Sequence, residues 1–169
     1  MTPEQAYGIT QFLVANLRDE YKTTRRLLEA VPADKLAYQP SEKCMCGGAL
    51  AGHIAGAEVM FLNSVISGEF QRPPADLADK LKTPADVIAY YDQVPALLDE
   101  VAKLSPEQCA KVIPFFTFQM PAVVLLNLNL KHGIHHRGQL SAYLRPMGGK
   151  VPAIYGGSAD EPMNLPATA

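Results

Sequence analysis

Apolar residues recur at intervals of three and four along most of this chain, and this spacing is typical of helices with one buried face. Stretches rich in Pro and Gly separate the periodic segments. Strand signals are weak, and no internal repeat is visible. The pattern predicts four helices, at about residues 3–30, 48–67, 83–104 and 121–144.

The starts of two of these segments carry clear helix signals. Thr2 and Thr83 stand at N-cap positions, and each is followed by a proline, which fits the first helical turn. The region between the third and fourth segments is less regular. There, Ser105 opens a short helical turn, and "VIPFFTF" at 112–118 is compatible with an extended conformation.

Four helices of this length predict an all-α protein, a four-helix bundle in which residues 1–169 form a single domain. The connections of about 15 residues are long for a minimal bundle, so we expect long connecting loops to cover one end. The segment from about 146 to 169 has no periodicity, and it predicts an irregular C-terminal tail.

Composition and charge exclude several classes of function. Hydrophobic residues make up 48% of the chain and charged residues 19%, which is typical of a globular protein. The net charge is −2 and the longest basic run is Arg25–Arg26, so neither nucleic acid nor an anionic membrane is an expected partner. The N-terminus lacks the basic start of a signal peptide, and no uninterrupted apolar run reaches bilayer length. Three cysteines are too few for a disulfide framework, so we expect a cytoplasmic protein with reduced thiols.

Three of the four histidines lie within the segment "HGIHH" in the last predicted helix. Residues four apart on a helix differ by about 40° in direction and by roughly 6 Å along the axis. His132 and His136 therefore share a face, and both imidazoles can reach one metal ion. His135 lies about 100° from His136, so it can pair with His132 but does not easily complete the same face.

Both faces that carry these histidines are apolar. The stripe of His132 and His136 also holds Leu125, Leu128, Leu140 and Tyr143, and His53 in the second helix is flanked by small and aliphatic residues. Each histidine could be a core residue satisfied by its own hydrogen bond. Burying three imidazoles is costly without partners, however, and one shared cation satisfies all three. Three protein ligands leave a position open for water or substrate, and imidazoles suit zinc, nickel, iron or copper.

Other polar residues near these positions are weaker candidates. Gln139 could orient a ligand histidine or a bound water, although surface capping explains it equally well. Tyr143 and His135 could also lie around the site, with a core position favoured for Tyr143. Cys44 and Cys46 stand two apart at a helix start, where a thiol pKa is lowered, yet buried small hydrophobes are the favoured interpretation.

The remaining charged candidates lie off the histidine face. Glu58 points about 140° away from His53, so we do not expect it to bind the metal. Arg137 lies on another face from His136, where an anionic partner or an acidic residue of a neighbouring helix would explain it. No Ser-His-Asp set, phosphate loop or carboxylate pair is supported by the spacing, so no catalytic residue is assigned.

The segments "HGIHHRGQLSAYLRPMGGKVPAIYG" and "ALAGHIAGAE" resemble the closing motif and the first-ligand motif of the DinB-like superfamily, the damage-inducible metalloprotein family. The resemblance spans nearly the whole chain in helix order. It implies a four-helix bundle, often dimeric, with His53, His132 and His136 on one divalent metal, namely zinc, nickel or iron. The residue before the closing motif is often Asn in the family and is Lys131 here.

The resemblance also implies a range of functions. Related branches transfer low-molecular-weight thiols or isomerise substrates with a thiol cofactor, so a metal-dependent thiol transferase or hydrolase acting on a small electrophilic substrate is one expectation. A non-catalytic metal or small-ligand binding protein of the stress response is a second. A dimerising interaction module without metal is the third.

Overall fold

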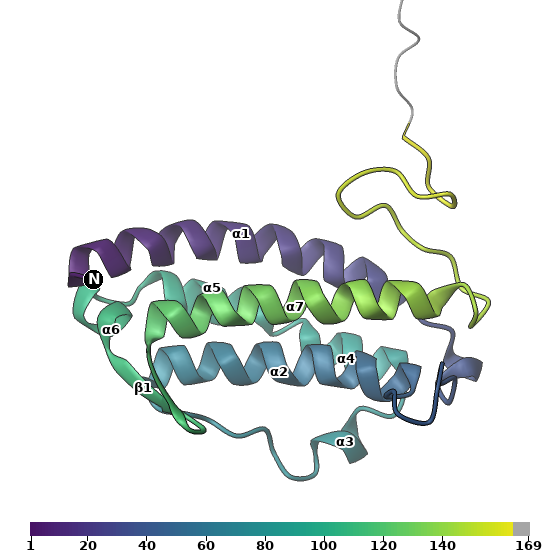
Figure 1. Ribbon diagram of the computed structural model, residues 1–169, viewed down its shortest axis with the longest axis horizontal. Coiled ribbons are helices and arrows are strands. Elements are labelled where there is room, and N and C mark those ends of the chain that lie inside the picture. Colours follow the sequence, from purple (N-terminus) through teal and green to yellow (C-terminus); the bar gives the residue numbers. More distant parts are fainter. Residues whose placement is uncertain (164–169) are drawn as a thin grey trace, which may run out of the picture.

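The computed structural model describes residues 1–163, and most of them are helical (Figure 1). The helices are α1 (Pro3–Glu29), α2 (Gly47–Ser67), α3 (Leu77–Lys80), α4 (Pro84–Tyr91), α5 (Val94–Ala102), α6 (Pro106–Ala110) and α7 (Ala122–Leu144), with a 3-10 turn η1 (Ala33–Lys35). Two short strands, β1 (Val112–Phe115) and β2 (Phe118–Pro121), precede α7. The prediction of an all-α four-helix bundle is confirmed.

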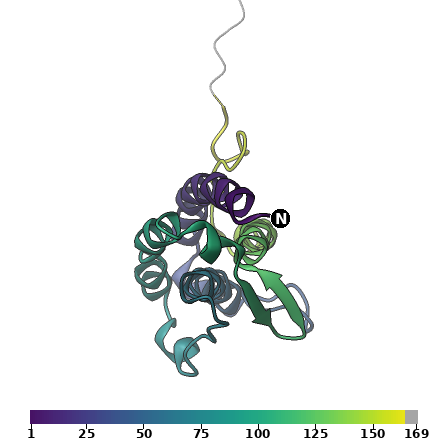
Figure 2. The same ribbon diagram turned by 90° about the vertical axis from the view of Figure 1, so that its left-hand side faces the viewer.

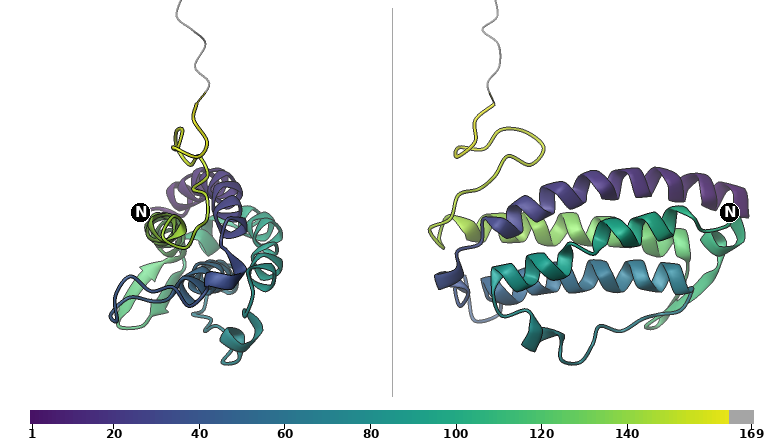
Figure 3. Two further views of the ribbon diagram at one scale, coloured as in Figure 1. Left: turned by 90° about the vertical axis from the view of Figure 1, so that its right-hand side faces the viewer. Right: turned by 180° about the vertical axis from the view of Figure 1, so that it is seen from behind.

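The four positions of the bundle are occupied by α1, α2, the α4–α5 pair and α7, as the end-on views show (Figures 2 and 3). Helix α7 packs against both α1 and α2, and the α4–α5 pair packs on the other side of both. Helices α1 and α7 run one way, whereas α2 and α4–α5 run the other way (Figure 1). Because α2 and α4 are parallel, residues 68–83 must run back along the length of the bundle.

The third predicted helix is not continuous, so this prediction was wrong in its detail. Helix α4 ends at Tyr91, and α5 begins at Val94. Pro95 lies at the start of α5, where its ring would clash with the Tyr91 carbonyl if the first helix continued. Both pieces still occupy one position of the bundle, since their buried residues Tyr91, Val94 and Leu98 face the same core.

Most of the region 112–118 is extended, as the sequence predicted, with a turn at residues 116–117. Strands β1 and β2 pair antiparallel, with Phe115 opposite Phe118, and form a small hairpin beside the bundle (Figure 2). The turn places Phe116 at φ +53°, a left-handed conformation that a bulky side chain rarely adopts. The short helical turn expected after Ser105 is α6, and the hydroxyl of Ser105 caps it.

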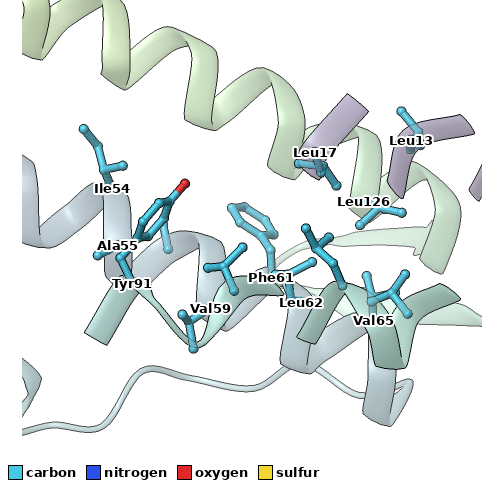
Figure 4. Close-up of a cluster of buried hydrophobic side chains, with 14 of the residues drawn as sticks. Leu13, Leu17, Ile54, Ala55, Val59, Phe61, Leu62, Val65, Tyr91 and Leu126 are labelled. Atoms are coloured by element: carbon cyan, nitrogen blue, oxygen red, sulfur yellow. The ribbon is translucent and has the colours of Figure 1, made fainter. Parts of the chain in front are cut away.

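Helix α2 is the most deeply buried element. It supplies Leu50, Ile54, Leu62 and Val65 to the core. Figure 4 shows Ile54, Leu62 and Val65 together with residues of α1, α4 and α7. By length and composition α2 would pass for a membrane-spanning helix, but 67% of the qualifying window is buried inside the protein. Its apolar character is therefore accounted for by packing against its neighbours.

The C-terminal segment is irregular, as predicted, and it is anchored to the bundle where it is described. Asp160 pairs with Arg145 at 3.0 Å, and Glu161 pairs with Arg26 at 2.6 Å. The predicted tail extends to residue 169, and its last residues, 164–169, lie outside the described range.

Candidate metal centre

Three imidazoles from two antiparallel helices converge near the middle of the bundle. The Nε2 atom of His53, on α2, lies 3.1 Å from Nε2 of His132 and 3.2 Å from Nε2 of His136, both on α7. One ligand atom from each ring lies within 4.8 Å of the other two, and all three side chains are half-buried. The close approach of α2 and α7 thus joins the two separate histidine motifs into one cluster.

This geometry fits a divalent metal ion. A tetrahedral ion with metal–nitrogen distances of about 2.0–2.1 Å separates its ligand nitrogens by roughly 3.3 Å, close to the separations of His53 from the other two nitrogens. A hydrogen bond satisfies the cluster less well, because one N–H on His53 Nε2 can point at only one of its two neighbours. The three side chains could hold one ion and leave a coordination position open.

The surroundings favour the neutral form of two of these imidazoles, His53 and His132. Burial, followed by the charges of the neighbouring imidazoles, lowers the pKa of His132 to about 4. Burial is also the main cause that lowers the pKa of His53, with His136 as the second. A neutral imidazole has a nitrogen lone pair for a metal, whereas a protonated one has none.

Gln139 orients one member of the cluster. Its Oε1 atom lies 3.0 Å from Nδ1 of His136, one turn away on α7. An amide oxygen only accepts, so Nδ1 of His136 must carry the proton, and its Nε2 then presents a lone pair to the cluster. Of the two interpretations of Gln139, orientation of a histidine is the one that matches its position.

The other residues considered around the site lie farther out. His135 is exposed; its ring stacks edge-on against His136 at 4.7 Å, and it is not among the three converging imidazoles. Tyr143 is buried and packs edge-on against Tyr38, which agrees with a core role.

The two cysteines at the start of α2 are half-buried rather than fully buried. Cys44 lies 3.2 Å from the Ser41 hydroxyl, and this hydrogen bond is the main cause that lowers the pKa of the Cys44 thiol. Cys46 is the N-cap residue of α2. Neither belongs to the histidine cluster.

Arg137 and Glu58, which the sequence predicts to lie off the histidine face, are buried and have partners within the protein. Arg137 is 1% exposed and pairs with Glu20 of α1, the acidic neighbour that one interpretation required. Glu58 is also buried, accepts a hydrogen bond of 2.7 Å from the Tyr91 hydroxyl, and has a pKa raised by burial to about 7. The break before α5 and the packing of α4 on α2 create this contact, so no sequence spacing indicated it.

A large pocket opens onto the histidine cluster. Its volume is about 1250 Å³, and His53 and His132 are among its lining residues. The pocket lies between α2, the connection 68–83 and the hairpin, and most of its lining side chains are apolar. A fourth ligand could therefore reach an ion at the cluster from this side.

Residues 6–164 match the sequence profile described as the DinB family. The chain belongs to the DinB family. Two Bacillus subtilis (strain 168) proteins described as uncharacterized are similar to it: YjoA, 26% identical over 138 residues (80% of this chain, 89% of YjoA), and YrdA, 28% identical over 145 residues (84% and 85%).

Solved structures of DinB-like proteins resemble this family member over most of its length. The crystal structure of Bacillus subtilis YjoA has a TM-score of 0.66 and 26% identity, covering 92% of this chain and 99% of YjoA. A DinB-like protein of Bacillus cereus ATCC 10987 has a TM-score of 0.69 at 19% identity, covering 85% and 95%, and this likeness concerns the fold alone.

Proposed function

We propose that this DinB family member binds one divalent metal ion through His53, His132 and His136 and uses it to act on a small electrophilic substrate. The observation that carries the proposal is that Nε2 of His53 lies 3.1 Å from Nε2 of His132 and 3.2 Å from Nε2 of His136, beside a large pocket. Zinc, nickel and iron all suit an imidazole set of this kind.

Side chains of this protein would hold the ion and limit how a ligand can approach it. Gln139 fixes the tautomer of His136, and Phe61 packs edge-on against His132 with ring centroids 5.4 Å apart, which limits how that ring can rotate. When bound, the ion would supply a positive charge that favours the anion of a thiol or a water molecule in its open position. The pocket side of His53 and His132 is where such a nucleophile and an electrophile would meet.

We therefore favour a metal-dependent thiol transferase or hydrolase in the cytoplasm. A low-molecular-weight thiol as co-substrate and a homodimeric state are further expectations from the family. No lining residue within 1–163 is an Asp or Glu, so no carboxylate is available there as general base. This observation is the reason to keep a second candidate function, a protein that binds a metal and a small ligand without turnover.

The first test is the metal content per chain, measured by elemental mass spectrometry on untagged protein after loading with zinc. We expect about one ion per chain in the wild type, loss of that ion in His53→Ala, His132→Ala and His136→Ala, and its retention in His135→Ala. A wild type that takes up no metal would contradict the proposal. If fold and dimer state then also survive chelator treatment unchanged, the interaction module would be favoured.

The second test separates a transferase from a binding protein. Glutathione and 1-chloro-2,4-dinitrobenzene are supplied together; the thiolate sulfur forms a bond to the ring carbon, and chloride leaves. p-Nitrophenyl acetate tests hydrolysis, in which water attacks the carbonyl carbon and nitrophenolate leaves. Turnover that needs the loaded metal supports the enzyme. Metal-dependent glutathione binding without turnover of either probe supports the second candidate function.

A further inference from the structure

The pocket beside the histidine cluster has one wall made of very small residues. Gly48, Gly52 and Gly56 recur every four residues along α2 and line it together with Ala49 and Ala57. Leu77 and Leu81 of the connection 68–83 lie directly against this face, since a Cβ atom on Gly56 would be 3.0 Å from Leu77 and one on Gly52 would be 3.8 Å from Leu81. The small residues therefore let the connection approach α2 closely, and an apolar body would lie in the pocket beside these leucines.

Part of the pocket lining, beginning beside His132, is aromatic. Phe61, Phe70, Phe115 and Phe116 all line it, and their rings pack against one another; Phe70 and Phe115, for example, lie 5.0 Å apart. Phe116 is held in this position by the strained turn of the hairpin, although 68% of it is exposed to solvent. Exposed aromatic residues that border an apolar pocket indicate a ligand that covers them.

The charges on the lining all have one sign. Arg72 and Lys82 lie on the connection 68–83, and no lining residue within 1–163 is acidic. Arg72 has no ion pair with any residue in 1–163, and Lys82 reaches only Asp79, at 4.0 Å. An apolar pocket bordered by a free guanidinium discriminates in favour of anions and against cations.

We infer that this pocket binds an amphipathic carboxylate, with its medium-length apolar body against the apolar and aromatic lining and its carboxylate at Arg72. The inference rests on the proposed function in taking this pocket as the substrate side of the metal site. The contacts it names are made by α2, the connection 68–83 and the hairpin, which do not need the ion. A guanidinium suits this role because its two N–H groups can bind both oxygens of a carboxylate.

The inference is tested by isothermal titration calorimetry with decanoate, decylammonium and decanol, each below its micellar concentration. Wild-type protein is titrated in the metal-free and in the zinc-loaded state. We expect decanoate to bind in both states, at least tenfold more tightly than decylammonium. Equal affinity for the two ions, tighter binding of decylammonium, or no decanoate binding in either state would overturn the inference.

Substitution of Arg72 tests where the carboxylate end of the ligand binds. Arg72→Gln should weaken decanoate binding about tenfold and leave decanol binding unchanged, whereas Arg18→Gln, an exposed arginine of α1 outside the pocket, should change neither. If decanoate binds only the zinc-loaded protein and Arg72→Gln has no effect, the carboxylate lies at the metal, and the assignment to Arg72 is wrong. Metal content is measured in a separate experiment. If the protein binds no metal, the titration of the metal-free protein still tests whether the pocket binds a carboxylate.

Gly52 provides the test of the apolar wall. A Cβ atom there would lie 3.8 Å from the side chain of Leu81, an ordinary contact, so Gly52→Ala should fold normally. Gly52→Leu is too large for the gap to Leu81 and would push that side chain and the connection 68–83 away from α2. It should reduce decanoate binding at least tenfold, with circular dichroism showing an intact helical fold. Undiminished binding in the folded Gly52→Leu protein would place the ligand elsewhere and overturn the inference.

Discussion

Two neighbouring residues of α7, Arg137 and His136, lie in regions that differ in whether their polar groups are paired within the protein. Arg137 faces α1, where it is buried, pairs with Glu20 and donates to the Thr24 hydroxyl at 3.2 Å. His136 faces α2, where its Nε2 atom lies 3.2 Å from another imidazole nitrogen, and no carboxylate among residues 1–163 lines the pocket beside the cluster. The first region has its donors matched by acceptors, whereas the second has converging nitrogens that a cation would match.

The difference shows how a buried polar group that stabilises a fold can be told from one that is available for binding. The α1 side behaves as a closed network, because charge and hydrogen bonds are balanced within the chain. The α2 side is half-buried, brings together three imidazole nitrogens and opens to a pocket. Variants on the first side should therefore change stability, and variants on the second should change ligand binding.

The largest effect on stability is expected on the α1 side. Arg137→Leu removes the ion pair with Glu20 and the hydrogen bond to Thr24 at a site where the arginine side chain is only 2% exposed. Glu20 is 20% exposed and keeps the hydrogen bond from the Tyr155 hydroxyl, so we expect a loss of about 3 kcal/mol in the free energy of unfolding, measured with urea. Arg18→Leu, which breaks an exposed pair with Asp99, should cost less than about 1 kcal/mol. If folded Arg137→Leu protein lost its metal, the two regions would be coupled rather than separate.

The second largest effect on stability is expected from metal binding on the α2 side. Zinc that binds only the folded protein should raise the free energy of unfolding by about 2.7 kcal/mol when its free concentration is 100 times the dissociation constant. This gain should disappear in His136→Ala and persist in His135→Ala, as followed by thermal unfolding with and without zinc. An equal gain in His136→Ala would mean that zinc stabilises the protein through some other site.

The third prediction concerns Glu58, a buried carboxyl group that has its hydrogen-bond partner, Tyr91, within the chain. Its folded-state pKa is raised to about 7, so the folded chain keeps a proton there that the unfolded chain has lost. The stabilisation from this proton is present at low pH and is lost as the pH rises through 7, amounting to about 2 kcal/mol between about pH 5.5 and 7.5.

Glu58→Gln removes this pH dependence and still accepts the hydrogen bond of Tyr91. Wild type and variant are compared by urea unfolding at both pH values in the absence of metal, so that the histidines contribute equally to both proteins. The variant should gain about 2 kcal/mol relative to wild type on going to the higher pH. A difference that stays constant with pH would mean that Glu58 is already ionised in the folded protein.

The smallest effect is expected from the residue that orients the cluster. Gln139→Ala removes the acceptor that fixes the tautomer of His136 and should weaken zinc affinity about tenfold, measured by competition with a chelator. Gln139→Glu keeps an acceptor at this position and should retain the affinity. Unchanged zinc affinity in Gln139→Ala would show that the His136 ring is held by packing alone.

Several features could be predicted from the sequence because they depend on local pattern. The spacing of His132 and His136 places them on one face of a helix whatever that helix packs against. The helix starts at Thr2 and Thr83 have capping boxes, since the cap needs only the residues that follow it. The family resemblance, read from the two histidine motifs, is confirmed by the match over residues 6–164.

Other features were decided only by tertiary structure, because they join residues that are far apart in the chain. His53 reaches the histidines of α7 across 79 and 83 residues, and Arg137 reaches Thr24 of α1 across 113. The pocket exists because the parallel arrangement of α2 and α4 makes the connection 68–83 run back beside a glycine face. Helical periodicity specifies which side of each helix is buried, but the choice of neighbour is made by packing of the whole chain.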